Sequence, residues 1–318
     1  AAAGGMRLLQ SRATAPTAVK TSLAVLPFRN DTGDARFDWV RTGVTSAVRT
    51  GLLQARALRL AGDDRVEEIL GVLKPGEGEE ARPATAQRIG KLVGVENLLA
   101  GSLLKVGDGF RIEASLLSVG DAAITATRPI VIDGAGEGSI PAMMEDLTRR
   151  VRDELGVSKR WGEKASGAAE LSSRSVEALA LYGDALALAR SGNQMEAAKR
   201  LEAAVVKDPQ FAMAEALLAE TYDALGYGDK AKLAAEKAAE MARHASPYEM
   251  AYLRAVRARI AQDLDSAVKA YAEICDLIPN SADAFFDLGS VQEQRGDLDL
   301  ALLSFRKAVS LDPRFTAA

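Results

Sequence analysis

The first residues that could do chemistry are Asp31, Thr32 and Gly33, which closely follow the apolar stretch LAVLPF. A carboxylate in such a loop can serve as one half of a pair that shares a proton, as catalysis by two aspartates requires. Here Arg29 and Asn30 separate Asp31 from the apolar stretch. We therefore expect the triplet to form a turn, in which Asp, Asn and Gly are favoured. An aspartic-type hydrolase that uses Asp31 from each of two copies is kept as an alternative.

Catalysis that depends on histidine or cysteine has few candidate residues, because the chain contains one histidine, His244, and one cysteine, Cys275. These counts exclude zinc, haem and iron–sulfur sites that need several such ligands, and a single cysteine excludes an internal disulfide. His244 is expected near the end of a helix, where a basic side chain favourably meets the terminal carbonyls. The pair Gly90-Lys91 lacks the preceding glycine and the following Ser or Thr of a phosphate-binding loop. The sequence thus predicts no enzyme, no cofactor and no metal site.

The charge of the chain gives little reason to expect nucleic acid or an anionic membrane as partner. The 318 residues include 40 basic and 44 acidic side chains, for a formal net charge of −4, and the two signs are well mixed. No stretch approaches the roughly 18 apolar residues of a membrane span, and the start AAAGGMRLLQ lacks the apolar core of a signal peptide. We expect a chain that lies in the cytoplasm, or one from which a targeting or anchoring segment is missing.

The first half of the chain, residues 22–157, alternates between strand and helix patterns after a flexible segment over 1–21. Buried strands are expected at 22–28 and 58–62, and amphipathic helices at 37–55, 63–73, where an Asp would cap the start, 85–94 and 140–155. Three strands in succession, at 96–106, 109–119 and 122–132, are separated by Gly- and Asp-rich turns and form an antiparallel meander. This order predicts an α/β domain with a mixed sheet.

The second half is helical and repeats itself. A polar stretch over 158–177 reads as a linker, and beyond it Gly192 and Gly226 are 34 residues apart, as are Pro279 and Pro313. Gln262 stands where the other repeats have Gly. Paired helices with a 34-residue period resemble tetratricopeptide (TPR) repeats, four of which would fill residues 178–318 as an all-α solenoid.

The resemblance to TPR arrays implies a binding surface for a protein or peptide partner, because the first helix of each repeat lines a concave groove. Carried over by repeat position, the groove residues are Tyr182, Arg190, Met213, Glu220, Asp223, Tyr252, Val256, Arg259, Phe286, Ser290 and Gln294. Each of them has the alternative role of an ordinary solvated or interhelical residue. The Asn and Lys pattern of the chaperone-tail clamp is missing. No polar capping helix follows the last repeat, so we expect further repeats, an oligomer or another partner to cover it.

The first half resembles the amino-terminal domain family that includes TolB and the CsgG- and FlgO-like proteins. The resemblance rests on LAVLPFRNDTGD near the start and on IGKLVGVENLLAGSLLKV from Ile89 onwards. The same domain precedes TPR repeats in extracytoplasmic regions of bacterial transmembrane Ser/Thr kinases and adenylate cyclases. The resemblance implies an interaction or sensory module with no catalytic residues.

Taken together, these patterns predict a non-enzymatic interaction or sensory module that works in bacterial envelope signalling or assembly. The compartment implied by the resemblance is the periplasm or another extracytoplasmic space, with the cytoplasm as the alternative. A second hypothesis makes the chain the extracytoplasmic sensor region of a transmembrane kinase or cyclase.

Overall fold

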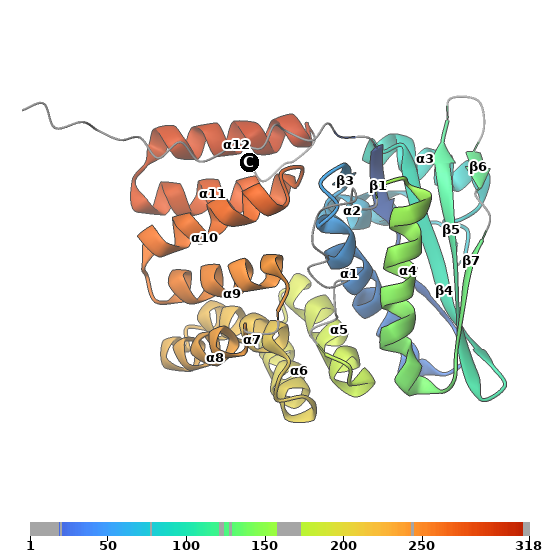
Figure 1. Cartoon of the computed structure of the whole chain (residues 1–318), viewed down its shortest axis with the longest axis horizontal. Helices are drawn as coiled ribbons and strands as arrows, with labels where there is room; N and C mark the ends of the chain where they lie inside the picture. Colours follow the sequence, from blue (N-terminus) through green and yellow to red (C-terminus); the bar gives the residue numbers. More distant parts are fainter. Residues whose placement is uncertain are drawn as a thin grey trace, which may run out of the picture.

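The structure is a computed structural model, and it describes residues 19, 21–76, 78–120, 124–126, 129–157, 173–242 and 245–313. Within these residues the chain forms a mixed β-sheet covered by helices, followed by an array of helices (Figure 1). Three expectations fall wholly or mostly outside the described residues, namely the flexible segment predicted over 1–21, whose last residue, Thr21, instead begins a strand, most of the linker, over 158–172, and the position of His244.

The elements of the first half follow the predicted order closely. The strands are β1 (Thr21–Val25), β2 (Arg29–Asp31), β3 (Leu58–Leu60), β4 (Asn97–Val106), β5 (Gly109–Val119), β6 (Ile124–Ala126) and β7 (Ile130–Gly134). The helices are α1 (Val40–Leu53), α2 (Asp63–Leu73), α3 (Pro83–Val93) and α4 (Ile140–Glu154), with short 3₁₀ turns at Ala35–Phe37 and Glu137–Ser139. Every predicted helix of this half is therefore present.

The sheet is mixed, as predicted, with the strand order β3-β1-β4-β5-β6. Strand β1 pairs in parallel with β3 and β4, and the long strands β4 and β5 form an antiparallel hairpin. The turn of this hairpin is Gly107-Asp108, where Gly107 has a φ of 59° that a side chain would disfavour.

The sheet has a helical layer on each face, and the alternation of side chains along β1 shows why. Leu23 and Val25 point into a core shared with α1 and α4, whereas Ala24 and Leu26 point into a second core shared with α2 and α3. All four residues are buried. A strand that is apolar on both faces needs cover on both sides, which is what the continuous run LAVL predicts.

Three local predictions need correction. Arg29–Asp31 is a short strand, β2, because β4 extends past the end of β1 and offers its free backbone groups at Ser102–Leu104. The last predicted strand is divided into β6 and β7, with Pro129, which has no N–H to donate, directly before β7. Asp63 does not cap α2, whose N-cap residue is Gly62.

The described residues of the second half form four antiparallel helix pairs, as the 34-residue period predicts. They are α5 (Val176–Arg190) with α6 (Gln194–Lys207), α7 (Ala212–Ala224) with α8 (Gly228–Met241), α9 (Pro247–Ile260) with α10 (Leu264–Leu277), and α11 (Ala282–Arg295) with α12 (Leu298–Leu311). The turn within each pair contains a residue with positive φ, and in the third pair this residue is Gln262, at 59°. The left-handed conformation ends the first helix of each pair.

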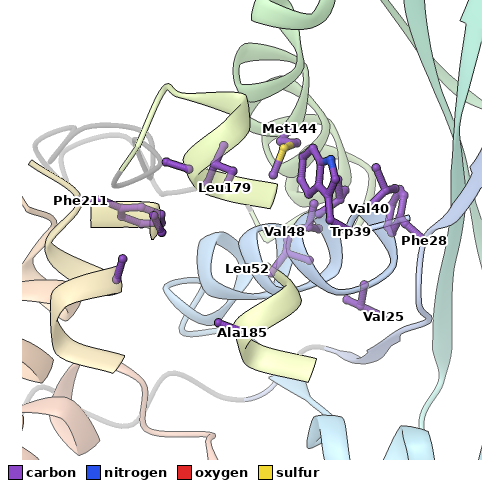
Figure 2. Close-up of a cluster of buried hydrophobic side chains, with 14 of the residues drawn as sticks. Val25, Phe28, Trp39, Val40, Val48, Leu52, Met144, Leu179, Ala185 and Phe211 are labelled. Carbon is purple, nitrogen blue, oxygen red and sulfur yellow. The ribbon is translucent and has the colours of Figure 1, made fainter. Parts of the chain in front are cut away.

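Helices α1 and α5 cross at two glycines, and this crossing joins the α/β half to the array. A Cβ atom placed on Gly183 would lie 3.0 Å from the Cα atom of Gly43 and 3.2 Å from the carbonyl oxygen of Trp39. One cluster of buried side chains continues from Val25 on the sheet, through α1, to Leu179 on α5 (Figure 2). The two halves therefore share a hydrophobic core.

Polar contacts join the two halves at the first helix pair of the array and at the junction between its third and fourth pairs. Asp63 on α2 accepts a hydrogen bond from Arg190 on α5 at 2.6 Å and pairs with Arg49 on α1, also at 2.6 Å. Near the last repeat, Arg56 donates to the carbonyl oxygen of Asp276 at 2.8 Å and accepts from the side chain of Asn280. The α/β half thus spans the array from its first pair to the loop before its fourth.

The strained turn of the third pair predicts a stabilising substitution. Gln262→Gly should raise the free energy of unfolding by about 0.5–1 kcal/mol, because a left-handed residue with a side chain costs more than glycine. The loss of the weak hydrogen bond from its side chain to the Arg259 carbonyl, at 3.2 Å, should subtract little. Urea denaturation measures the change. Gly226→Ala, at a φ of 77°, should change the stability in the opposite direction, and a loss of stability in Gln262→Gly would contradict the strain.

The close crossing of α1 and α5 predicts that replacing a glycine there destabilises the protein. Gly183→Ala should lower the free energy of unfolding by about 1–3 kcal/mol, because its methyl group would meet backbone atoms of α1 that cannot rotate away. Gly71→Ala on α2 is the matched control, since nothing lies within 4 Å of its Cβ position and alanine favours a helix. Equal effects of the two substitutions in urea denaturation would show that the crossing is not tightly packed.

Candidate functional site

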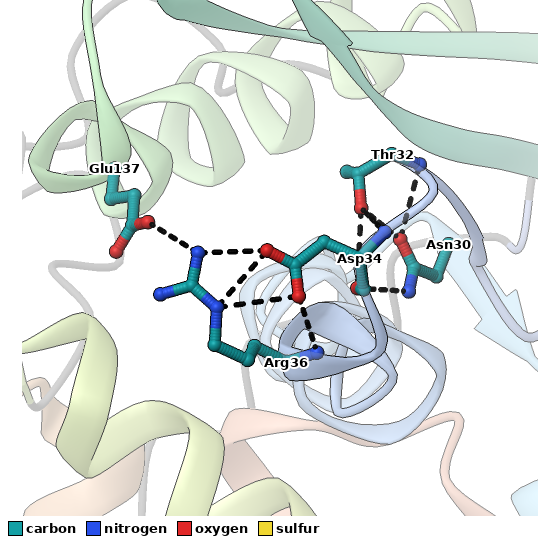
Figure 3. Close-up of polar contacts among 5 residues, drawn as sticks. All are labelled: Asn30, Thr32, Asp34, Arg36 and Glu137. Carbon is teal, nitrogen blue, oxygen red and sulfur yellow. Dashed lines mark hydrogen bonds and ion pairs between the residues drawn. The ribbon is translucent and has the colours of Figure 1, made fainter.

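The Asp31-Thr32-Gly33 triplet belongs to a hydrogen-bonded loop at the end of β2. The Asn30 side chain organises this loop: it accepts from the Thr32 backbone N–H at 3.1 Å and donates to the Asp34 carbonyl at 2.9 Å (Figure 3). Asp34 in turn accepts three side-chain hydrogen bonds from Arg36, at 3.2, 3.0 and 2.7 Å. The polar residues of the motif are therefore used to build the turn.

The Asp31 carboxylate itself forms an ion pair. Its oxygen accepts from Arg29 at 2.8 Å, and this hydrogen bond is the main reason why the pKa of Asp31 lies below its usual value. Catalysis by two aspartates needs a second carboxylate close enough to share a proton, whereas the side chain paired with Asp31 here is the guanidinium group of Arg29. The geometry of this loop gives the hydrolase alternative no support.

Cys275 is a buried residue of α10 and belongs to the core of the array. Its thiol donates to the Ala284 carbonyl at 3.3 Å, and burial raises its pKa to about 12. A reactive cysteine needs a lowered pKa and an accessible sulfur atom, so this thiol is structural.

Among the described residues, no group of three or more His, Cys, Asp or Glu side chains is placed to hold a metal ion. None of the described helices combines the length and the apolar character needed to cross a membrane.

A pocket of about 290 Å³ opens between helices of the last three repeats. We call it the groove pocket. Helix α7 contributes one residue, α9 two, α10 one and α11 four. Its lining consists of Glu220, Tyr252, Arg259, Tyr271, Asp287, Ser290, Val291 and Gln294. The pocket thus combines two phenol rings, three charged groups and two neutral polar groups on a rigid helical frame.

Glu220 is the centre of the hydrogen bonds in the groove pocket. One carboxylate oxygen accepts from the Tyr252 hydroxyl at 2.9 Å, and the other accepts from Arg259 at 2.6 Å. The Tyr252 ring in turn stacks on that of Tyr248, with centroids 6.3 Å apart. These contacts join α7 to α9 and fix the orientation of the aromatic wall.

Asp287 is the second acidic residue of the groove pocket, and its environment differs from that of Glu220. Its side chain is solvent-exposed at the open side of the pocket, and the neighbouring protein atoms replace only part of its hydration. This desolvation raises the pKa of Asp287 to about 7, helped by the negative charges of Asp283 and Glu220 and opposed by Arg259. Asp287 is therefore a carboxyl group that changes its charge near neutral pH.

Five of the residues predicted to line the groove come together in this pocket. They are Glu220, Tyr252, Arg259, Ser290 and Gln294. The remaining six lie elsewhere, and their positions follow from the packing of the repeats. Arg190 is bound to Asp63 of the α/β half, and Asp223 is exposed on α7 outside the pocket.

The other four predicted residues contribute mainly to packing. Val256 must be corrected from a groove residue to a core residue, because it is completely buried. Tyr182 packs its ring against Phe211 at 5.0 Å, Met213 lies partly buried against the main core, and Phe286 packs against Phe305 at 5.6 Å.

Three pocket residues are missing from the prediction: Tyr271, Asp287 and Val291. A signal for two of them is present, since positions 287, 290, 291 and 294 lie on one face of a helix. Tyr271 is harder to predict from the sequence. It comes from α10, the second helix of a repeat, whereas the resemblance to TPR arrays places the groove on the first helices.

Comparison with known proteins identifies the last helix pair. Residues 282–315 match the tetratricopeptide repeat family, and this range contains α11 and α12. The three preceding pairs have the same arrangement of two helices around a tight turn. Such repeats form extended concave surfaces that bind proteins, so the array is of a kind used for protein–protein interaction.

No curated protein matches the chain in sequence. Among solved structures, MamA 41-end from Desulfovibrio magneticus RS-1 is 18% identical with a TM-score of 0.34, over 56% of this chain and 97% of that one. The structure described as MamA RS-1 ArsTM double mutant is 17% identical with a TM-score of 0.33, over 57% and 92%. At this level of similarity neither structure says what the groove pocket binds.

The raised pKa of Asp287 predicts a pH-dependent stability. Because the folded protein holds this proton more tightly than the unfolded chain, stability falls as the pH rises from about 4 to about 7. Asp287→Asn should remove this loss and stabilise the protein at pH 8 more than at pH 4.5 in urea denaturation. Ser290→Ala, a neutral change on the same helix face, should act equally at both pH values. An Asp287→Asn effect that is independent of pH would contradict the assignment.

Proposed function

We propose that this chain is a non-enzymatic interaction module whose groove pocket binds an extended peptide segment of a partner protein. The observation that carries the proposal is the pocket itself, because its lining comes from three consecutive repeats and combines aromatic walls with hydrogen-bonding groups. Tyr and Arg are the residues that most often anchor protein interfaces. The pocket has room for side chains rather than for a folded domain.

The α/β half has a supporting role in this proposal. It packs against α5 through Gly43 and Gly183 and reaches the loop before α11 through Arg56. These contacts hold the first helix pair and the junction between the third and fourth pairs at a set separation, so the groove pocket is preorganised. Preorganisation lowers the cost of ordering the site when a partner binds.

For the cellular setting, we propose an extracytoplasmic role in bacterial envelope signalling or assembly, with the cytoplasm as the alternative compartment. The support is the resemblance of the first half to TolB- and CsgG-like domains and its position before TPR repeats. The second hypothesis, the sensor region of a transmembrane kinase or cyclase, differs only in the domains that accompany this chain. The full-length gene distinguishes the two.

Peptide selection tests the proposed function. Random peptides displayed on phage should enrich for sequences that bind the full chain, and the affinity of synthetic copies can be measured by fluorescence anisotropy. Gln294→Trp should weaken their binding at least about tenfold, because an indole at this exposed edge fills the pocket. Gln210→Trp is the matched control, at an exposed position between α6 and α7, and should change the affinity less than about twofold.

Two results would contradict this function. One is the absence of any enriched peptide. The other is binding that survives Gln294→Trp unchanged, which would place the binding surface outside the groove pocket.

A further inference from the structure

The groove pocket contains one acidic side chain that is paired with an arginine and one that is not. Arg259 forms an ion pair with Glu220 at 2.6 Å, which leaves this pair close to neutral. Asp287 has no hydrogen-bond or ion-pair partner among the described residues. Asp283 lies one helical turn earlier on α11, so its charge adds to that of Asp287. With Asp287 ionised, the lining as a whole carries a net negative charge.

The walls of the groove pocket also favour a cation. Tyr252 and Tyr271 present phenol rings, and the face of an aromatic ring attracts an ammonium or guanidinium group. Ser290 and Gln294 supply oxygen atoms that can accept hydrogen bonds from such a group. A water molecule takes up about 30 Å³ of liquid volume, so 290 Å³ has room for one long side chain.

From this combination we infer that the groove pocket receives an arginine or lysine side chain of the bound peptide, paired with Asp287. This inference rests on the proposed function and names the chemistry of its ligand. An acidic side chain is the competing occupant, because the Nε atom of Arg259 is buried without a hydrogen-bond partner. However, the carboxylates of Glu220, Asp283 and Asp287 lie nearby and would repel an acidic side chain.

The titration of Asp287 adds a pH dependence to this binding. The groups whose charges act on Asp287 are Asp283, Glu220 and Arg259, and Tyr248, Tyr271 and Cys275 also lie within its electrostatic reach. Because the pKa of Asp287 is raised to about 7, the carboxyl group is largely neutral at pH 6 and ionised at pH 8. A bound cation is therefore held more tightly at pH 8, and its binding at pH 7 releases a proton.

Small probes test the inference directly on the full chain. N-acetyl-arginine amide and N-acetyl-citrulline amide have nearly the same shape, but only the first is charged. NMR titration at pH 8 should show that the arginine probe binds at least about tenfold more tightly than the citrulline probe. At pH 6 this preference should shrink. N-acetyl-glutamate amide represents the acidic occupant and should not bind.

Two variants show whether Asp287 is responsible. Asp287→Asn should abolish the preference for arginine over citrulline, whereas Asp299→Asn, at an exposed position on α12, should retain it. Equal binding of the two probes, tighter binding of the glutamate probe, no binding at millimolar concentration, or an unchanged preference in Asp287→Asn would each overturn the inference.

The outcome separates the inference from the proposed function. If phage-selected peptides bind the groove pocket and lose affinity in Gln294→Trp but need no basic residue, the function stands and the cation site is wrong. If the selected peptides carry a required Arg or Lys whose contribution disappears in Asp287→Asn, both are supported.

Discussion

The close crossing of α1 and α5 is the constraint on which the rest of the structure depends. Only two facing glycines, Gly43 and Gly183, let the two backbones approach as far as they do. Trp39 lies beside the crossing, with its indole ring close to Gly43, and fills the space around it (Figure 2). Because of this contact the sheet, its covering helix and the first repeat share one core, and the α/β half is held against the array rather than tethered to it.

The groove pocket is a consequence of this frame. Each repeat contributes little by itself, since the charges of the pocket belong to α7, α9 and α11, and only their stacking brings these helices together. The same stacking gives the two acidic residues of the pocket, Glu220 and Asp287, different surroundings. Glu220 receives two hydrogen bonds and serves to fix the wall, whereas Asp287 remains available for a ligand. Similar side chains thus differ in role because their neighbours differ.

Periodicity predicted most of the fold. The alternation of apolar residues predicts the strands, the spacing of Gly192 and Gly226 predicts the helix pairs, and both are confirmed in the structure. Local interruptions were harder to foresee. Strand β2 forms because β4 offers it free backbone groups, and Asp63 binds two arginines, one of them on α5, in place of capping its own helix. Partners distant in the sequence decide such features.

The sequence by itself determined the type of each element, the four repeats and the absence of ligand sets for multi-cysteine or multi-histidine metals, because these depend on composition and on contacts between near neighbours. Only the tertiary structure decided which groove residues meet. Val256 and Tyr252 occupy the same predicted surface, yet one is buried in the core and the other lines the pocket. The rotation of each helix depends on what packs behind it, and that packing includes an α/β half more than a hundred residues away in the chain.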